Sequence, residues 1–181
     1  MSSQRSIQNL ALIGFMGTGK SSVGRIVAAQ IHFQFVDSDE LIESRAGCSI
    51  NEIFKKSGEE VFRRVEKQIV QELSTYEKTV IATGGGLAAN PENMASLKSH
   101  ALVVCLWASP EVIWERVRTQ THRPLLQTPD PFARIKELLA AREPIYKQAD
   151  VLVNTEMRSV KEVSQHVLHQ FNSARAPGSQ M

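Results

Sequence analysis

Cysteine is scarce in this chain. Cys48 and Cys105 are the only two in 181 residues, they lie far apart, and they form no C-x-x-C pair. This spacing argues against a disulfide framework and against a cysteine-based zinc site. We therefore expect both cysteines to be small, buried apolar side chains.

Long hydrophobic runs are also missing. No stretch approaches the roughly 20 apolar residues that a membrane-spanning helix needs. The first six residues, MSSQRS, lack the apolar core of a secretion signal. We therefore expect a reduced, cytoplasmic setting and no membrane partner.

An excess of one charge is absent as well. The chain has 21 Lys and Arg against 19 Asp and Glu, which gives a net charge of +2. Such a balance gives no reason to expect a nucleic acid or an anionic membrane as the main partner. The length and the 42% hydrophobic content suit one compact α/β domain.

A glycine-rich segment carries the strongest functional signal. Residues 14–21 read GFMGTGKS and fit the phosphate-loop pattern G-x-x-x-x-G-K-[ST], directly after the apolar run 10–13. Glycines let backbone N–H groups converge on phosphate oxygens at a helix N-terminus. Lys20 can reach the β- and γ-phosphates, and Ser21 offers a hydroxyl to Mg²⁺. The pattern predicts a nucleoside triphosphate site formed by Gly17, Thr18, Gly19, Lys20, Ser21 and Ser22.

Four further β-prone segments follow the first one. They are residues 33–36, 79–82, 102–107 and 151–153, and helical patterns separate them. Strands that alternate with helices favour a parallel sheet, whose ligands bind at the carboxyl ends of the strands. The residues just after each strand are therefore the candidates for function.

Asp37 and Asp39 follow the second of these strands. On an extended segment they would point the same way, whereas in a turn they would cap a helix that begins near Glu40. An acceptor alcohol and Mg²⁺ both need carboxylates near a phosphate loop. Asp37 suits an outer-sphere role at the metal, and Asp39 suits a hydroxyl group.

Three glycines, at positions 84–86, follow the third strand. They could form only a tight turn into a helix capped near Asn90, but they also allow a substrate ring to lie against bare backbone. We favour the second interpretation. The nearby helical pattern 61–73 leaves Arg63 and Arg64 beside its apolar stripe, so either arginine could face a cleft.

Regular periodicity stops between residues 119 and 131, where a mobile lid is expected around Arg123. The small, polar residues 173–181 are expected to be a disordered tail. Surface salt bridging is the ordinary explanation for any single arginine, including Arg63, Arg123 and Arg142.

These motifs together resemble a bacterial shikimate kinase in order and spacing. The motifs are residues 14–21, 37–39, 62–66, 84–86, 123–126 and 142–146. The resemblance covers about residues 8–172. It implies a single domain, 1–181, with the three-layer α/β/α fold of nucleoside monophosphate kinases and a five-stranded parallel sheet. Residues 37–66 would form the substrate-binding helical region.

The resemblance also implies a reaction. ATP would phosphorylate the 3-hydroxyl of shikimate to give ADP and 3-phosphoshikimate, on the route to chorismate and the aromatic amino acids. Mg²⁺ would be the cofactor, ATP and shikimate the ligands, and a monomer the expected state.

Roles for individual residues follow from the same resemblance. Asp39 would bind the ring hydroxyls and Gly84, Gly85 and Gly86 the substrate through backbone. Arg63 and Arg142 would bind its carboxylate, with Glu66 orienting the arginines. The remaining assignments are ATP binding by Arg116, Arg123 and Arg158, metal binding by Ser21 and Asp37, and catalysis by Lys20, Asp39 and Arg123.

Two other classes of protein remain as alternatives. A gluconate-type or nucleoside monophosphate kinase would share the loop and the fold. A non-catalytic nucleotide-binding or switch module is less favoured, because the sequence has no N-K-x-D and no D-x-x-G motif.

Overall fold

A five-stranded parallel sheet forms the centre of the computed structural model, which describes residues 5–120 and 124–175. The strands are β1 (Asn9–Ile13), β2 (Gln34–Asp37), β3 (Thr79–Ala82), β4 (Ala101–Trp107) and β5 (Val151–Asn154). Their order across the sheet is β2-β3-β1-β4-β5, and every neighbouring pair is parallel. The predicted sheet is therefore confirmed.

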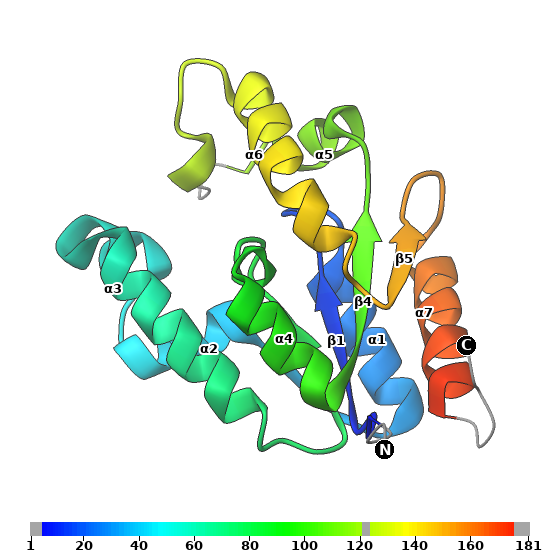
Figure 1. Ribbon diagram of the computed structural model, residues 1–181. Helices are drawn as coiled ribbons and strands as arrows, with labels where there is room; N and C mark the ends of the chain where they lie inside the picture. Colours follow the sequence, from blue (N-terminus) through cyan, green and yellow to red (C-terminus); the bar gives the residue numbers. More distant parts are fainter. Residues whose placement is uncertain (1–4, 121–123, 176–181) are drawn as a thin grey trace.

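Seven α-helices surround this sheet in the described part of the chain (Figure 1). They are α1 (Lys20–Ile31), α2 (Ser38–Ala46), α3 (Ile50–Leu73), α4 (Pro91–His100), α5 (Pro110–Val117), α6 (Pro131–Tyr146) and α7 (Val160–Arg175). Two short 3₁₀ turns, η1 (Leu87–Ala89) and η2 (Pro124–Leu126), precede α4 and α6. Helices α5 and α6 lie beyond the carboxyl ends of the strands (Figure 1).

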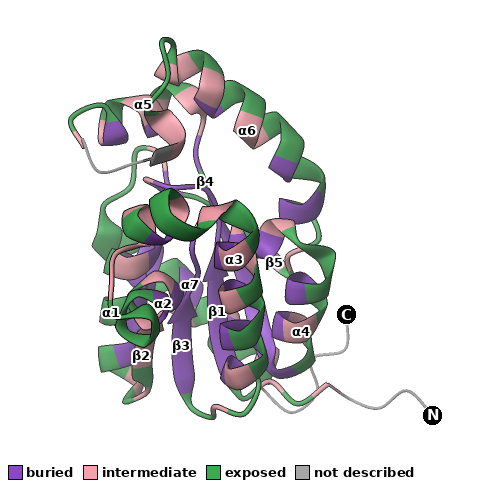
Figure 2. Ribbon diagram, turned by 90° about the vertical axis from the view of Figure 1, so that its left-hand side faces the viewer, coloured by how far each residue is buried: buried purple, intermediate pink, exposed green. Residues whose placement is uncertain are grey.

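Alternate residues of the central strand face two different helical layers. Leu10 and Leu12 pack in one core with side chains of α1 and α7, whereas Ala11 and Ile13 pack in another with side chains of α4. Buried residues fill β1, β3 and most of β4 (Figure 2). Strands covered on both faces need mainly apolar side chains, which is why these segments read as hydrophobic runs. The buried polar residues Asn9 and Thr79 at their ends pair with each other, since the Thr79 backbone N–H donates to Oδ1 of Asn9 at 3.0 Å.

Helix α3 is longer than the pattern in residues 61–73 predicts. It begins at a capping box, in which the Ser49 side chain accepts from the Glu52 backbone N–H and Glu52 accepts from the Ser49 backbone N–H. Gly58 interrupts the helix with φ 78° and ψ 173°, a combination that is accessible essentially only to glycine. The kink explains why helical periodicity is clear only after it.

Four strands are shifted or extended by one residue from the expected segments, and two helix boundaries differ by more than that. Strand β2 ends at Asp37 and passes straight into α2, so the helix begins before Glu40. Helix α7 continues to Arg175, which makes the first three residues of the expected tail helical. Residues 176–181 lie outside the described residues, as does Arg123 of the expected lid.

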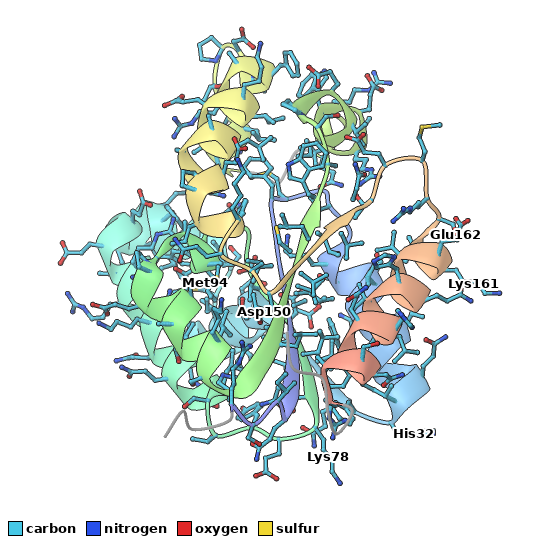
Figure 3. All side chains as sticks on the ribbon, turned by 45° about the vertical axis from the view of Figure 1, so that its right-hand side comes forward. His32, Lys78, Met94, Asp150, Lys161 and Glu162 are labelled. Carbon is cyan, nitrogen blue, oxygen red and sulfur yellow. The ribbon has the colours of Figure 1, made fainter. Side chains whose placement is uncertain are left out.

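Two residues with positive φ lie at the amino ends of the strands. His32 and Lys78, which precede β2 and β3, have φ values of 56° and 49° (Figure 3). Of the two cysteines, Cys105 is buried as expected, whereas Cys48 is only half-buried. No helix within residues 5–120 and 124–175 is long and apolar enough to cross a bilayer.

Candidate active site

The glycine-rich loop joins the carboxyl end of β1 to the first turn of α1. Gly14, Gly17 and Gly19 have φ values of 134°, 78° and 91°, which L side chains rarely adopt. A Cβ atom at Gly17 would lie 2.7 Å from Cγ1 of Val117, and one at Gly14 would collide with the Leu106 carbonyl oxygen. The loop therefore needs glycine both for its backbone angles and for its close packing.

The side chains of this loop brace it from inside. Lys20 is 9% exposed, and its Nζ donates to the carbonyl oxygens of Gly14 at 2.9 Å and Phe15 at 2.8 Å. The Thr18 hydroxyl donates to the same Phe15 carbonyl at 2.8 Å. Helix α1 has no side-chain cap at its N-cap residue Gly19. Its first backbone N–H groups are therefore oriented toward any anion at the loop.

An oxygen-rich corner lies where α1 meets the end of β2. The Ser21 hydroxyl donates to Oδ2 of Asp37 at 2.6 Å, and Oδ1 of Asp37 accepts from the Asp39 backbone N–H at 3.0 Å. Asp37 is thus the N-cap of α2, and Asp39 lies in its first turn. The alternative in which both aspartates alternate on an extended segment is wrong, because the helix begins at Ser38.

Asp39 packs directly against the glycine triplet. A Cβ atom at Gly84 would lie 2.3 Å from Oδ1 of Asp39, so any side chain there would displace the carboxylate. The Gly84 backbone N–H also donates to the Ser38 hydroxyl at 2.8 Å. The first glycine of the triplet is therefore needed for the close approach of the Asp39 carboxylate, a reason that neither interpretation of the sequence gave.

Arg63 projects from α3 into the site. Its Nη1 donates to Oε2 of Glu66 at 3.0 Å, and Nη2 lies 3.0 Å from Oε1 of Glu59. Glu66 is 2% exposed. Burial raises the pKa of Glu66, and the Arg63 guanidinium opposes that shift. Arg64 pairs instead with exposed Glu60, so of the two arginines Arg63 is the one that faces the cleft.

Arg142 approaches the same place from α6. It is 8% exposed, its Nη1 donates to the Gly85 carbonyl at 2.8 Å, and its guanidinium carbon lies 5.4 Å from the centroid of the Phe15 ring. A Cβ atom at Gly86 would lie 3.1 Å from Nη1 of Arg63 and 3.4 Å from Nη2 of Arg142. Two guanidinium groups therefore converge above Gly86.

Two adjoining cavities connect these groups. The larger, of about 550 Å³, contains Arg63, Arg142 and the glycine triplet, and the smaller, of about 340 Å³, contains Gly17, Lys20 and other residues of the loop region. The lining residues that both cavities share are Met16, Ser21, Asp37, Asp39 and Gly85. The cavity beside the glycine-rich loop and the guanidinium-lined cavity thus meet at a serine hydroxyl and two carboxylates.

The remaining arginines are spread more widely. Nη1 of Arg116 donates to the Gly17 carbonyl at 3.2 Å and to the Thr155 hydroxyl at 3.0 Å, so it borders the smaller cavity. Arg158 is exposed on the loop after β5, where Nη1 lies 3.4 Å from the Asn154 carbonyl, and it lines neither cavity. Arg123 lies outside the described residues.

Comparison with known proteins places the chain in a family. Residues 16–172 match the family described as shikimate kinase. The chain belongs to the shikimate kinase family. A shikimate kinase of Thermodesulfovibrio yellowstonii is 46% identical over 165 residues, which cover 91% of this chain and 95% of that protein. One from Thermus thermophilus is 45% identical over 172 residues, 94% of each chain.

Solved structures agree with this placement. The shikimate kinase of Acinetobacter baumannii in complex with shikimate superposes with a TM-score of 0.90 at 34% identity, over 96% of this chain and 97% of that one. A gluconokinase of Sinorhizobium meliloti shares only the fold, with a TM-score of 0.60 at 19% identity, over 93% and 94% of the two chains. This member of the shikimate kinase family is thus an ATP-dependent kinase with the fold that the sequence predicts.

Sequence reasoning missed one polar side chain of the site. The Tyr146 hydroxyl donates to the Gly85 carbonyl at 2.6 Å. A signal was available, because Tyr146 lies four residues after Arg142, a spacing that places two side chains on one helix face. The pattern alone could not show which glycine carbonyl they would share.

Proposed function

We propose that this kinase transfers the γ-phosphoryl group of ATP to the 3-hydroxyl of shikimate. The observation that carries the proposal is the junction of the two cavities at Ser21, Asp37 and Asp39, with two guanidinium groups lining the larger one. Phosphoryl transfer requires the acceptor to lie in line with the leaving group. Two adjoining cavities suit that requirement.

The nucleotide would bind at the loop. Backbone N–H groups of residues 17–22 would hold its phosphates, and Lys20 would turn from the loop carbonyls toward the β- and γ-phosphate oxygens. Arg116 would lie on the nucleotide side, and Arg123 would approach the phosphates from the lid. Arg158 is proposed near the adenine, since it follows β5 on the same rim of the sheet.

The oxygen-rich corner suits Mg²⁺. The Ser21 hydroxyl and the Asp37 carboxylate, 2.6 Å apart, are hard oxygen donors of the kind that this ion prefers. Ser21 would ligate the ion directly and Asp37 through water. When bound, Mg²⁺ would supply positive charge that offsets charge on the transferring phosphoryl group.

Shikimate would occupy the larger cavity. Its carboxylate would pair with the guanidinium groups of Arg63 and Arg142, because a guanidinium group is permanently charged and forms bidentate hydrogen bonds with a carboxylate. Its ring would lie against the bare backbone of residues 84–86. Asp39 would accept a hydrogen bond from the attacking hydroxyl, and that it also takes the proton is a hypothesis.

The architecture of the chain is proposed on the same basis. We infer one domain with a substrate-binding region at residues 37–66 and a lid at residues 119–131, working as a cytoplasmic monomer. Closure of the lid would exclude water and limit wasteful hydrolysis of ATP. Hydrogen exchange in the lid should therefore slow when both substrates bind, and equal exchange rates with and without substrates would contradict this.

A coupled ADP-release assay tests the function. Mg·ATP is supplied with shikimate, gluconate, AMP or no acceptor, and Arg142→Ala is measured in parallel. We expect turnover with shikimate alone and, in the variant, a weakened apparent affinity for shikimate. Turnover with gluconate or AMP would favour another small-molecule kinase, and ATP binding without turnover would favour a binding module.

A further inference from the structure

Tyr146 and Arg142 share one acceptor. Both side chains come from α6, and both donate to the Gly85 carbonyl oxygen, the Tyr146 hydroxyl at 2.6 Å and Nη1 of Arg142 at 2.8 Å. Tyr146 is 4% exposed, and burial raises its pKa to about 12. Its hydroxyl therefore remains a proton donor throughout the physiological range of pH.

Two donors on one carbonyl fix the orientation of a peptide group. In a trans peptide the C=O and the following N–H point in opposite directions. With the Gly85 carbonyl held by α6, the Gly86 N–H must point away from α6. Both glycines line the larger cavity. Donors on the carbonyl also polarise the amide and strengthen its N–H as a donor.

The shared carbonyl also constrains the arginine. A hydrogen bond through Nη1 leaves Nη2 of Arg142 near Gly86, where a guanidinium nitrogen of Arg63 lies as well. If the Gly85 peptide turned, Arg142 would turn with it. A phenylalanine at position 146 would fill the same buried space and would need no hydrogen-bond partner. Packing alone therefore does not explain why a tyrosine stands there.

We propose that Tyr146 is a positioning residue, whose hydroxyl fixes the Gly85 peptide and thereby aims the Arg142 guanidinium at the carboxylate of the acceptor. The inference rests on the proposed function, in which Arg142 binds that carboxylate. Tyr146 itself does not touch the substrate. Its effect should therefore appear only when the acceptor carries a negative charge for Arg142 to bind.

The test compares Tyr146→Phe with the unchanged enzyme on two acceptors, shikimate and its carboxamide analogue. The KM for shikimate should rise about three- to tenfold, the usual effect of one lost hydrogen bond, while the KM for ATP stays unchanged. The carboxamide should show no such increase. Tyr76→Phe is the matched control, because its hydroxyl donates to the partly buried Glu72 at 2.9 Å and it lines neither cavity, so it should change neither KM.

The background of Arg142→Ala separates two kinds of failure. If Tyr146 acts through Arg142, the Tyr146→Phe penalty should vanish in that background. If Arg142→Ala impairs both acceptors equally, the proposed binding of the carboxylate fails. If Arg142→Ala raises the KM for shikimate more than that for the carboxamide but Tyr146→Phe does not, only the role of Tyr146 is overturned. The same holds if Tyr146→Phe also raises the KM for ATP.

A labelling experiment keeps the hydroxyl in place and does not depend on the folding of Tyr146→Phe. The chain has two tyrosines, so 3-fluorotyrosine in the Tyr76→Phe variant labels position 146 alone. Its fluorine resonance should shift when shikimate is added, and much less with the carboxamide. Equal shifts with both acceptors would contradict the inference.

Discussion

Replacing Gly84 by alanine should damage the enzyme through one neighbouring side chain. The added Cβ would lie 2.3 Å from Oδ1 of Asp39, against 3.4 Å for ordinary contact, so the carboxylate must move by about 1 Å. Gly84 is not among the glycines with positive φ, and its backbone therefore tolerates alanine. The strain falls on the end of a movable side chain in the cleft and not on the core.

The size of the effect follows from that displacement. A reacting group misplaced by about 1 Å can cost on the order of 10²-fold in rate. We expect kcat/KM for shikimate to fall by about that factor. Because Asp39 lies at the edge of a cavity, the free energy of unfolding should change by less than about 1 kcal/mol. Binding of ATP should also persist, since the phosphate loop is not displaced.

The assay is a double-mutant cycle. Steady-state kinetics are measured for Gly84→Ala, Asp39→Ala and the double variant, with chemical unfolding as the control for stability. If alanine at position 84 acts by moving Asp39, its penalty should be much smaller once Asp39 is absent. An equal penalty in both backgrounds, or an activity within threefold of the unchanged enzyme, would refute the reasoning.

Three further predictions concern catalysis, pH and the kink in α3. Asp39→Asn tests the proton acceptor, because an essential base contributes about 10²–10⁴-fold, so turnover within about tenfold in the ADP-release assay would exclude one. Burial, with the nearby charge of Arg5, lowers the pKa of His100, whose Nδ1 accepts from Asn9 at 2.9 Å. The unfolded chain then binds a proton at His100 that the native state does not, so the free energy of unfolding should fall as pH drops below about 6.5. Urea unfolding at pH 7.5 and 5.5 measures this fall, which should be smaller for His100→Gln than for the unchanged enzyme. Gly58→Ala should lose about 1–3 kcal/mol of stability in the same assay, since φ 78° with ψ 173° is strained for any side chain, and an unchanged midpoint would contradict that account.

Local sequence patterns were sufficient for most of the fold. The segments 10–13, 79–82 and 102–107 read as buried strands because parallel strands covered on both faces need mainly apolar residues. The glycine-lysine-serine pattern at residues 14–21 predicted the phosphate loop, because few other residues allow its backbone angles. These features depend on short stretches of chain, and therefore a sequence can show them.

The relation between the two aspartates was harder to predict. Asp37 and Asp39 suited either an extended segment or a helix start, and the pattern did not decide between them. The structure decides for the helix, in which Asp37 caps α2 and also accepts from Ser21. Ser21 belongs to α1, so its hydrogen bond to Asp37 cannot be read from the local pattern around the two aspartates.

The sequence by itself thus determined the strand and helix pattern and the glycine-rich loop, and through resemblance it predicted the residues of the site. Only the tertiary structure decided that Gly84 leaves room for Asp39 and that Tyr146 and Arg142 hold one carbonyl. It also agrees with the resemblance in turning Arg63, and not Arg64, toward the cleft. The physical reason is one of range. Backbone angles and apolar periodicity act over a few residues, whereas these contacts join side chains that are far apart in the chain and meet only when the sheet brings their elements together.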